Sequence, residues 1–134
     1  MMDLMSQINW LAVLAAAIAG FATGAVWYGV FAKPWMEAAG LSQEDLTQSP
    51  ALYAGAFGLQ LAMAFTIALV LVTTGISTWL GGALLGVALG IGVVTANKAL
   101  NASFQGTDKR LVLIDGLHAA TAFAFMGAIL GGWQ

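Results

Sequence analysis

The stretch GAVWYGVFAKPWMEAAG, residues 24–40, changes character half-way along its length. It is apolar as far as Phe31 and includes Trp27 and Tyr28, whose amphipathic rings are typical of the headgroup level of a membrane. Lys33 is the first positive charge of the chain, and Pro34 suits the first turn of a new, short helix. We therefore predict that an apolar helix reaches a membrane surface here and that the chain then turns back.

The composition of the 134-residue chain is that of a protein covered by lipid. Hydrophobic residues make up 60% of it and charged residues only 7%, whereas a soluble domain carries about 25% charged residues. Because a spanning helix needs about 20 apolar residues, four spans and their connections use the whole length. The net charge of −2 and the four Lys and Arg residues argue against nucleic acid as a partner, and the absence of Cys excludes disulfides and thiolate metal sites.

The apolar segments on either side of this stretch predict a single all-α domain, residues 1–134, with four transmembrane helices over about residues 8–31, 51–74, 78–101 and 111–133. In the long loop after the first span, residues 33–39 predict a short interfacial helix stopped by Gly40. Ser42 and Asp45 form a capping-box pattern, and Ser49 followed by Pro50 is typical of a helix start. A tight turn at residues 75–77 and a polar loop at residues 102–110 make the other connections.

Small residues recur at four-residue spacing along three of the predicted spans. Such ladders let another helix approach closely in a membrane, where the helix keeps its backbone hydrogen bonds. They fit packing inside the bundle, a seam between subunits or a pore. The ladders are Ala12, Ala16, Gly20 and Gly24; Gly82, Gly86 and Gly90; and Gly116, Ala120, Ala124, Ala128 and Gly132.

The charges predict an orientation for the four spans. All Lys and Arg residues fall in or beside the first and third loops, so the positive-inside rule places these loops in the cytoplasm and both termini outside. Asp3 and the length of the first apolar run argue against a cleavable signal peptide. Trp10 and Trp27 lie about 25 Å apart along a helix, which puts them at opposite membrane faces. The predicted interfacial anchors are Trp10, Trp27, Tyr28, Lys33, Trp35, Trp79 and Trp133.

Several of these features together resemble a bacterial membrane-protein family known as domain of unknown function 1761. The matching residues are NWLAV at 9–13, GAVWY at 24–28, the pattern K-x-W-M at 33–36 followed by Gly40, and GAILG-x-W at 127–133. Members of the family often carry Ser-Pro after the aromatic pair, where this chain has Gly29 and Val30. The resemblance covers nearly the whole length and implies a multi-pass protein of the bacterial inner membrane. The family brings no known activity.

Ionisable residues at membrane depth are costly and therefore mark candidate functional positions. Asp115 and His118 are three residues apart and share one face of the fourth span. By helical rise they lie roughly 7 Å and 12 Å from Arg110. We predict that they meet polar residues of other spans in one cytoplasm-facing cluster. The candidate substrate- or ion-binding residues are Asp115, His118, Gln60, Asn97, Asn101 and Lys98.

Two interpretations of this cluster stay open: a structural clasp between the third and fourth spans, or a site that relays protons or holds a cation. One His without Cys is a poor transition-metal set, and no catalytic motif is present, so we expect no metal, cofactor or enzymatic activity. The preferred function is a structural or accessory protein of the lipid bilayer that forms a homo-oligomer or joins a larger membrane complex. The alternative is a small transporter or channel, which a dimer could form, with a polar site in the cytoplasmic half built from Asp115, His118, Gln60 and Asn97.

Overall fold

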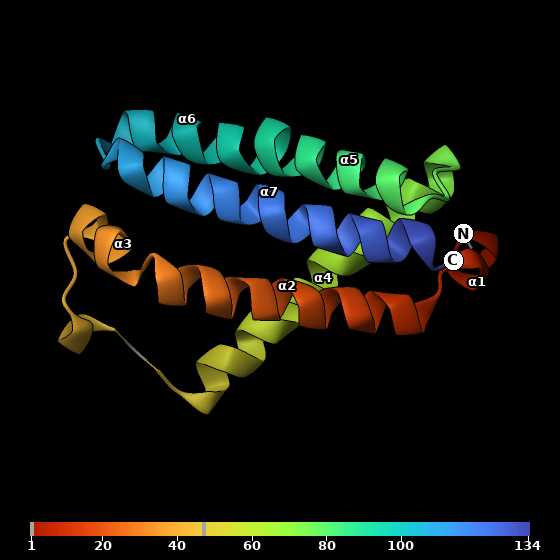
Figure 1. Cartoon of the computed structure of the whole chain (residues 1–134), viewed down its shortest axis with the longest axis horizontal. Helices are drawn as coiled ribbons and strands as arrows, with labels where there is room; N and C mark the ends of the chain where they lie inside the picture. The colour runs from red at the N-terminus through yellow and green to blue at the C-terminus, as the bar shows by residue number, and fades with distance from the viewer. Residues whose placement is uncertain (1, 47) are drawn as a thin grey trace.

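The computed structural model describes residues 2–46 and 48–134, which form helices and connecting turns without a strand. The helices long and apolar enough to cross a membrane are α2 (Trp10–Val30), α4 (Pro50–Thr74), the continuous run of α5 (Trp79–Leu89), η2 (Gly90–Thr95) and α6 (Ala96–Gln105), and α7 (Lys109–Gly132). The predicted all-α fold with four spanning helices is confirmed. Figure 1 shows α2, α5–α6 and α7 running side by side, whereas α4 runs obliquely to them.

The segment that follows α2 turns as the sequence predicts. The N–H of Phe31 still donates to the carbonyl of Trp27 at 2.8 Å, and α3 (Ala32–Ala39) begins at the next residue with Pro34 in its first turn. Gly40 ends α3 in the left-handed conformation, with φ of 71°, which glycine adopts without a steric cost. The short helix and its glycine stop are therefore confirmed.

The caps predicted before α4 are also confirmed. Asp45 accepts a hydrogen bond from the backbone N–H of Ser42 at 2.8 Å and closes a capping box, although the element it opens is a single 3₁₀ turn, η1 (Gln43–Asp45). The N–H and the hydroxyl of Ser42 hold the pKa of the Asp45 carboxyl below its usual value. Ser49 caps α4 by accepting a backbone N–H of its first turn at 3.1 Å, and Pro50 is the first residue of the helix.

The chain starts with a helix that the sequence did not indicate. This helix, α1 (Met2–Gln7), precedes α2, and Ile8 between them is buried at 5% exposure. Ile8 was predicted to open the first span. It lies outside α2 because Asn9 caps that helix, accepting from the N–H of Ala12 at 3.2 Å.

The third spanning helix is longer than predicted, and the loop after it is shorter. Residues 102–105 were assigned to a polar loop, but α6 continues through them to Gln105. The hydroxyl of Ser103 donates to the carbonyl of Ala99 at 2.9 Å, so a polar side chain is accommodated on the helix itself. The helix ends only at Gly106, with φ of 70°, and Asp108 caps α7 two residues later.

Glycines let α5 lie in backbone contact with α7. A methyl group at Gly82 would collide with the backbone of Gly127, and one at Gly86 with the backbone of Phe123. At Gly90, a methyl group would lie 2.5 Å from the Cα of Ala120. No side chain fits at these three positions, two in α5 and the third at the start of η2, without moving the helices apart.

The apolar core lies in one half of the bundle. Its buried residues come from the first half of α2, the second half of α4 and the second half of α7. The largest fully buried side chains are Ile67, Leu71 and Met126. The opposite half, towards which the first turns of α4 diverge, is packed less completely (Figure 1).

The positively charged side chains all lie at one end of the bundle. We call the end that carries Lys33, Lys98, Lys109 and Arg110 the basic end, and the end with α1 and the C-terminal residues the terminal end (Figure 1). Hydrogen bonds from Asn9 Nδ2 to the Trp133 carbonyl (3.2 Å) and from Gln134 Nε2 to the Ile76 carbonyl (2.8 Å) hold the terminal end together. The predicted anchors Trp10, Trp79 and Trp133 lie at this end, 53%, 63% and 48% exposed.

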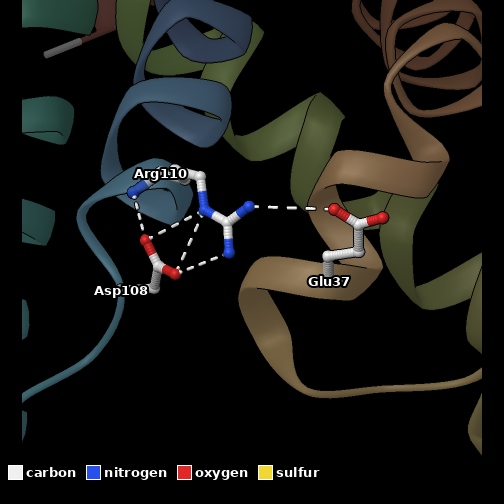
Figure 2. A network of polar contacts seen from close by, with 3 residues as sticks. All are labelled: Glu37, Asp108 and Arg110. Carbon is white, nitrogen blue, oxygen red and sulfur yellow. Dashed lines mark hydrogen bonds and ion pairs between the residues drawn. The ribbon is translucent and has the colours of Figure 1, made fainter.

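Arg110 links α3 to the start of α7 at the basic end (Figure 2). Its Nη2 donates to Asp108 Oδ2 at 2.9 Å, and its Nη1 lies 3.8 Å from Glu37 Oε2. Hydrogen bonds from Arg110 lower the pKa of the Asp108 carboxyl. The bond from the Arg110 side chain has the larger effect, and the bond from its backbone N–H has the smaller one. Exposed pairs of this kind contribute little to stability.

Candidate functional site

A cavity of about 660 Å³ occupies the half of the bundle nearest the basic end. Its walls come from α2, α4, the η2–α6 run and α7, while α3 and the loop before α4 cover it. The volume lies within the range of small-molecule sites, about 300–1,000 Å³. Most lining side chains are apolar, and the polar ones that reach it from the spanning helices are Tyr28, Gln60, Lys98, Asp115 and His118.

The Asp115 carboxylate connects three helices at the edge of this cavity. One oxygen accepts a hydrogen bond from the Tyr28 hydroxyl at 2.5 Å, and the other lies 2.5 Å from Nζ of Lys98. The side chain of Asp115 is 17% exposed and that of Lys98 is 41% exposed. Lys98 and Asp115, two residues of the predicted cluster, therefore form an ion pair, and Tyr28 of α2 adds to it.

Trp27 and Tyr28 were predicted to be anchors at the level of the headgroups. In the structure their polar atoms turn towards α7 instead. Trp27 Nε1 donates to the carbonyl of Ile114 at 3.0 Å, and Tyr28 reaches Asp115. The sequence contains a signal for this, because Tyr28 continues the four-residue ladder through Gly20 and Gly24 and so lies on the same helix face. Of the other predicted anchors near this end, Trp35 also lines the cavity and Lys33 is exposed.

Two polar atoms are buried beside the cavity without a hydrogen-bond partner among the described residues: Oε1 of Gln60 and Nε2 of His118. The His118 ring lies 4.9 Å from the ring of Tyr28 and 6.2 Å from that of Trp27. Buried polar groups of native proteins are nearly always paired, and an unpaired one costs about 1–3 kcal/mol. Both residues line the same cavity, whereas the two unpaired atoms themselves are covered by protein atoms and face Gly20 and Gly24 of α2.

The glycines of α2 make room for these two side chains. A methyl group at Gly24 would lie 3.4 Å from Nε2 of His118, and one at Gly20 would collide with Oε1 of Gln60. We expected the α2 ladder to admit the backbone of another helix, as the glycines of α5 do. At Gly20 and Gly24 it admits polar side chains instead.

The structure does not bring Asn97 and Asn101 to the cluster. Both are exposed and neither lines the cavity. A straight α-helix would continue the stripe of Gly82, Gly86 and Gly90 to these two residues, but the π-helical turn η2 inserts an additional residue and shifts the inward face.

Lys98 reaches the cavity on this shifted face, and Ala102 is buried on it. The hydroxyl of Thr95 donates to the carbonyl of Gly90 at 2.7 Å, across the π turn. Thr95 also packs on Gly116, where a methyl group would lie 2.6 Å from its side chain. The π turn therefore determines which residue of α6 belongs to the site.

Within residues 2–46 and 48–134, no group of three or more His, Cys, Asp or Glu side chains is placed to hold a metal ion. The polar groups of the cavity are an ion pair, a phenol, an imidazole and the amides of Gln60 and of the loop residues Gln43 and Gln48. This combination can bind a molecule through hydrogen bonds in an otherwise apolar chamber.

Four helices long and apolar enough to cross a membrane define an integral, multi-pass membrane protein. The chain belongs to the family described as protein of unknown function (DUF1761), whose family model matches residues 11–131. The resemblance noted from the sequence is therefore confirmed. No curated protein and no solved structure is matched by this chain. The activity has to be argued from the cavity.

Proposed function

We propose that the chain binds a small solute in the cavity and belongs to the transporter class rather than serving only as a structural protein. The carrying observation is a chamber of about 660 Å³ lined by Gln60 and His118, each of which has a buried polar atom, Oε1 and Nε2, without a partner among the described residues. A clasp between helices needs only Asp115, Lys98 and Tyr28, whose polar atoms are paired with each other. The packed core closes the cavity towards the terminal end, which fits a carrier open to one side.

The polar groups favour a neutral ligand that carries a hydroxyl group. The charges of Lys98 and Asp115 offset each other at 2.5 Å, and both carboxylate oxygens are occupied, so a free cation finds no unpaired anion there. A ligand hydroxyl can donate to the Gln60 amide oxygen, and it can donate to or accept from an imidazole nitrogen. The proposal involves binding and release, without a cofactor or a chemical conversion.

Gln60→Leu tests this proposal because a ligand-binding amide and a structural amide predict opposite effects on stability and on phenol binding. We expect stability to stay equal or to rise by about 1 kcal/mol, since the change removes an unpaired buried acceptor. We expect binding of phenol, a soluble hydroxyl probe, to weaken roughly tenfold through the lost hydrogen bond. Thermal unfolding and calorimetric phenol titration in lipid nanodiscs measure the two effects. Gln105→Leu, an exposed position outside the cavity, is the control, and lower stability with unchanged binding would show a structural amide.

We propose that the basic end faces the cytoplasm of a bacterial cell and that both termini lie outside. All four Lys and Arg residues lie at the basic end, and such a bias sets the orientation of short-looped membrane proteins. Reporter fusions after Gln134 and after Ser42 are expected to be active outside and inside the cytoplasm, respectively. A cytoplasmic signal from the fusion after Gln134 would reverse the orientation.

Self-association is a second candidate function, supported by the outer face of α4. Gly55 and Gly58 are exposed, and no described atom lies within 4 Å of a methyl group placed at either. Small residues on a lipid-facing helix let a second helix approach closely. We expect a dimer mass in nanodiscs that falls to a monomer in Gly58→Leu. A monomeric wild-type protein would leave solute binding as the sole candidate.

A further inference from the structure

A groove between α4 and the α5–η2 run adjoins the cavity. Its volume is about 240 Å³, and Met63, Val94 and Phe123 line both hollows. In the described structure α4 packs on α2 and α7 but forms no comparable pair with α5, η2 or α6. The bundle is therefore open between these helices, at a level where the spanning segments face lipid.

The groove presents mainly apolar surface. Ala62 and Val93 at its mouth are exposed, Val93 to 59%. The single hydroxyl, that of Thr66, donates to the carbonyl of Ala62 on its own helix at 2.8 Å. At about 240 Å³ the groove is smaller than an ordinary small-molecule site, about 300–1,000 Å³. It therefore suits one part of a ligand whose remainder lies in the cavity.

We propose that the cavity takes its ligand from the lipid phase, and that this ligand is a neutral amphipathic molecule with a hydroxyl-bearing head and an alkyl tail. The head lies at Gln60 and His118, and the tail leaves through the groove between α4 and η2. This inference rests on the proposed solute binding and adds the class of ligand and its route. Polar side chains, Gln60 and His118, in a cavity that adjoins an apolar groove fit such a molecule and do not fit an ion.

The π turn contributes to the opening. Gly90 at its start is pressed against Ala119 and Ala120 of α7, where a methyl group would lie 3.0 Å from the Ala119 carbonyl carbon. Val93 and Val94, in the middle of the turn, line the groove. The η2 turn therefore packs against α7 on one side. On its other side it presents Val93 and Val94 to the alkyl tail of the ligand.

The test compares phenol with 4-octylphenol, using full-length protein in phosphatidylcholine nanodiscs. Ala62→Trp fills the mouth of the groove, and we expect it to weaken 4-octylphenol binding roughly tenfold or more by steric overlap while phenol binding stays unchanged. Leu59→Trp is the matched control on the same helix. Leu59 is 66% exposed and lines none of the described cavities, so both affinities should remain as in the wild type.

The possible failures separate the two proposals. Wild-type protein that binds no phenol overturns the proposed function and this inference with it. Phenol binding together with unchanged 4-octylphenol binding in Ala62→Trp overturns the lateral route alone. A 4-octylphenol with a photoreactive diazirine at the end of its octyl chain labels the residues around the tail, and this measurement needs no variant. We expect labelled peptides from α4 and η2, and labelling elsewhere overturns the route.

Discussion

Gly86→Leu is expected to lower the free energy of unfolding by about 3 kcal/mol or more, or to prevent folding. The added side chain would overlap backbone atoms, which cannot move aside as a flexible side chain can. A single methyl group at Gly86 would already overlap the carbonyl of Phe123, and leucine adds three further carbons. The variant can be accommodated only if α5 and α7 separate. Unfolding in detergent, followed by circular dichroism together with the mass of the particle, measures the effect.

The control for this prediction is Gly29→Leu. Gly29 also lies in a spanning helix, but no described atom lies within 4 Å of a methyl group there. A change of less than about 0.5 kcal/mol is expected for such an exposed position. If Gly86→Leu melts like the control and keeps the same mass, then this face of α5 looks towards lipid.

The second large effect is expected at Asp115. Asp115→Leu removes the acceptor of both Tyr28 and Lys98 and should cost about 1–2 kcal/mol, the range of hydrogen bonds between membrane helices. The cost is limited because Lys98, at 41% exposure, can extend towards the membrane surface. Asp115→Asn keeps one carbonyl oxygen that can accept from Lys98, and its amide N–H can donate to the Tyr28 hydroxyl, so this variant should fold almost normally. Equal stability of the two variants would show that these contacts do not hold the helices together.

A comparison of Asp115→Asn with the wild type also distinguishes solute binding from ion transport. An amide cannot ionise, so Asp115→Asn would abolish flux if the carboxylate carried protons or cations. For a site that takes a neutral ligand, we expect phenol binding to persist in Asp115→Asn. Proteoliposomes of wild type and Asp115→Asn should show the same background flux of protons and small cations. Flux that is lost only in the variant would establish the ion site and refute the neutral one.

Much of the fold could be predicted because its signals are local. The end of α2, the short α3, its stop at Gly40 and the start of α4 at Pro50 each depend on a few neighbouring residues. The Lys98–Asp115 contact was predictable as well, since both residues lie near the basic ends of consecutive antiparallel helices. The depth of each residue follows from the number of helical turns between it and the end of its helix.

The rest of the site depends on geometry that local patterns do not contain. The ladder of α2 and that of α5 look alike in the sequence, yet Gly24 faces an imidazole and Gly86 faces a backbone. The π turn η2 moves the inward face away from Asn97, and no residue type marks such a turn. The oblique course of α4, which opens both the cavity and the groove, results from packing between helices distant in the sequence (Figure 1).

His118 allows a direct measurement of the proposed site, because it is the single histidine of the chain. In protein labelled with ¹⁵N-histidine, the imidazole gives one Nδ1 and one Nε2 resonance, and the latter reports on an atom that has no described partner. We expect phenol, titrated into nanodiscs that contain the protein, to shift the Nε2 resonance as a hydrogen bond forms, and to shift it less in Gln60→Leu. Imidazole resonances that stay fixed throughout the titration would contradict a ligand site at Gln60 and His118.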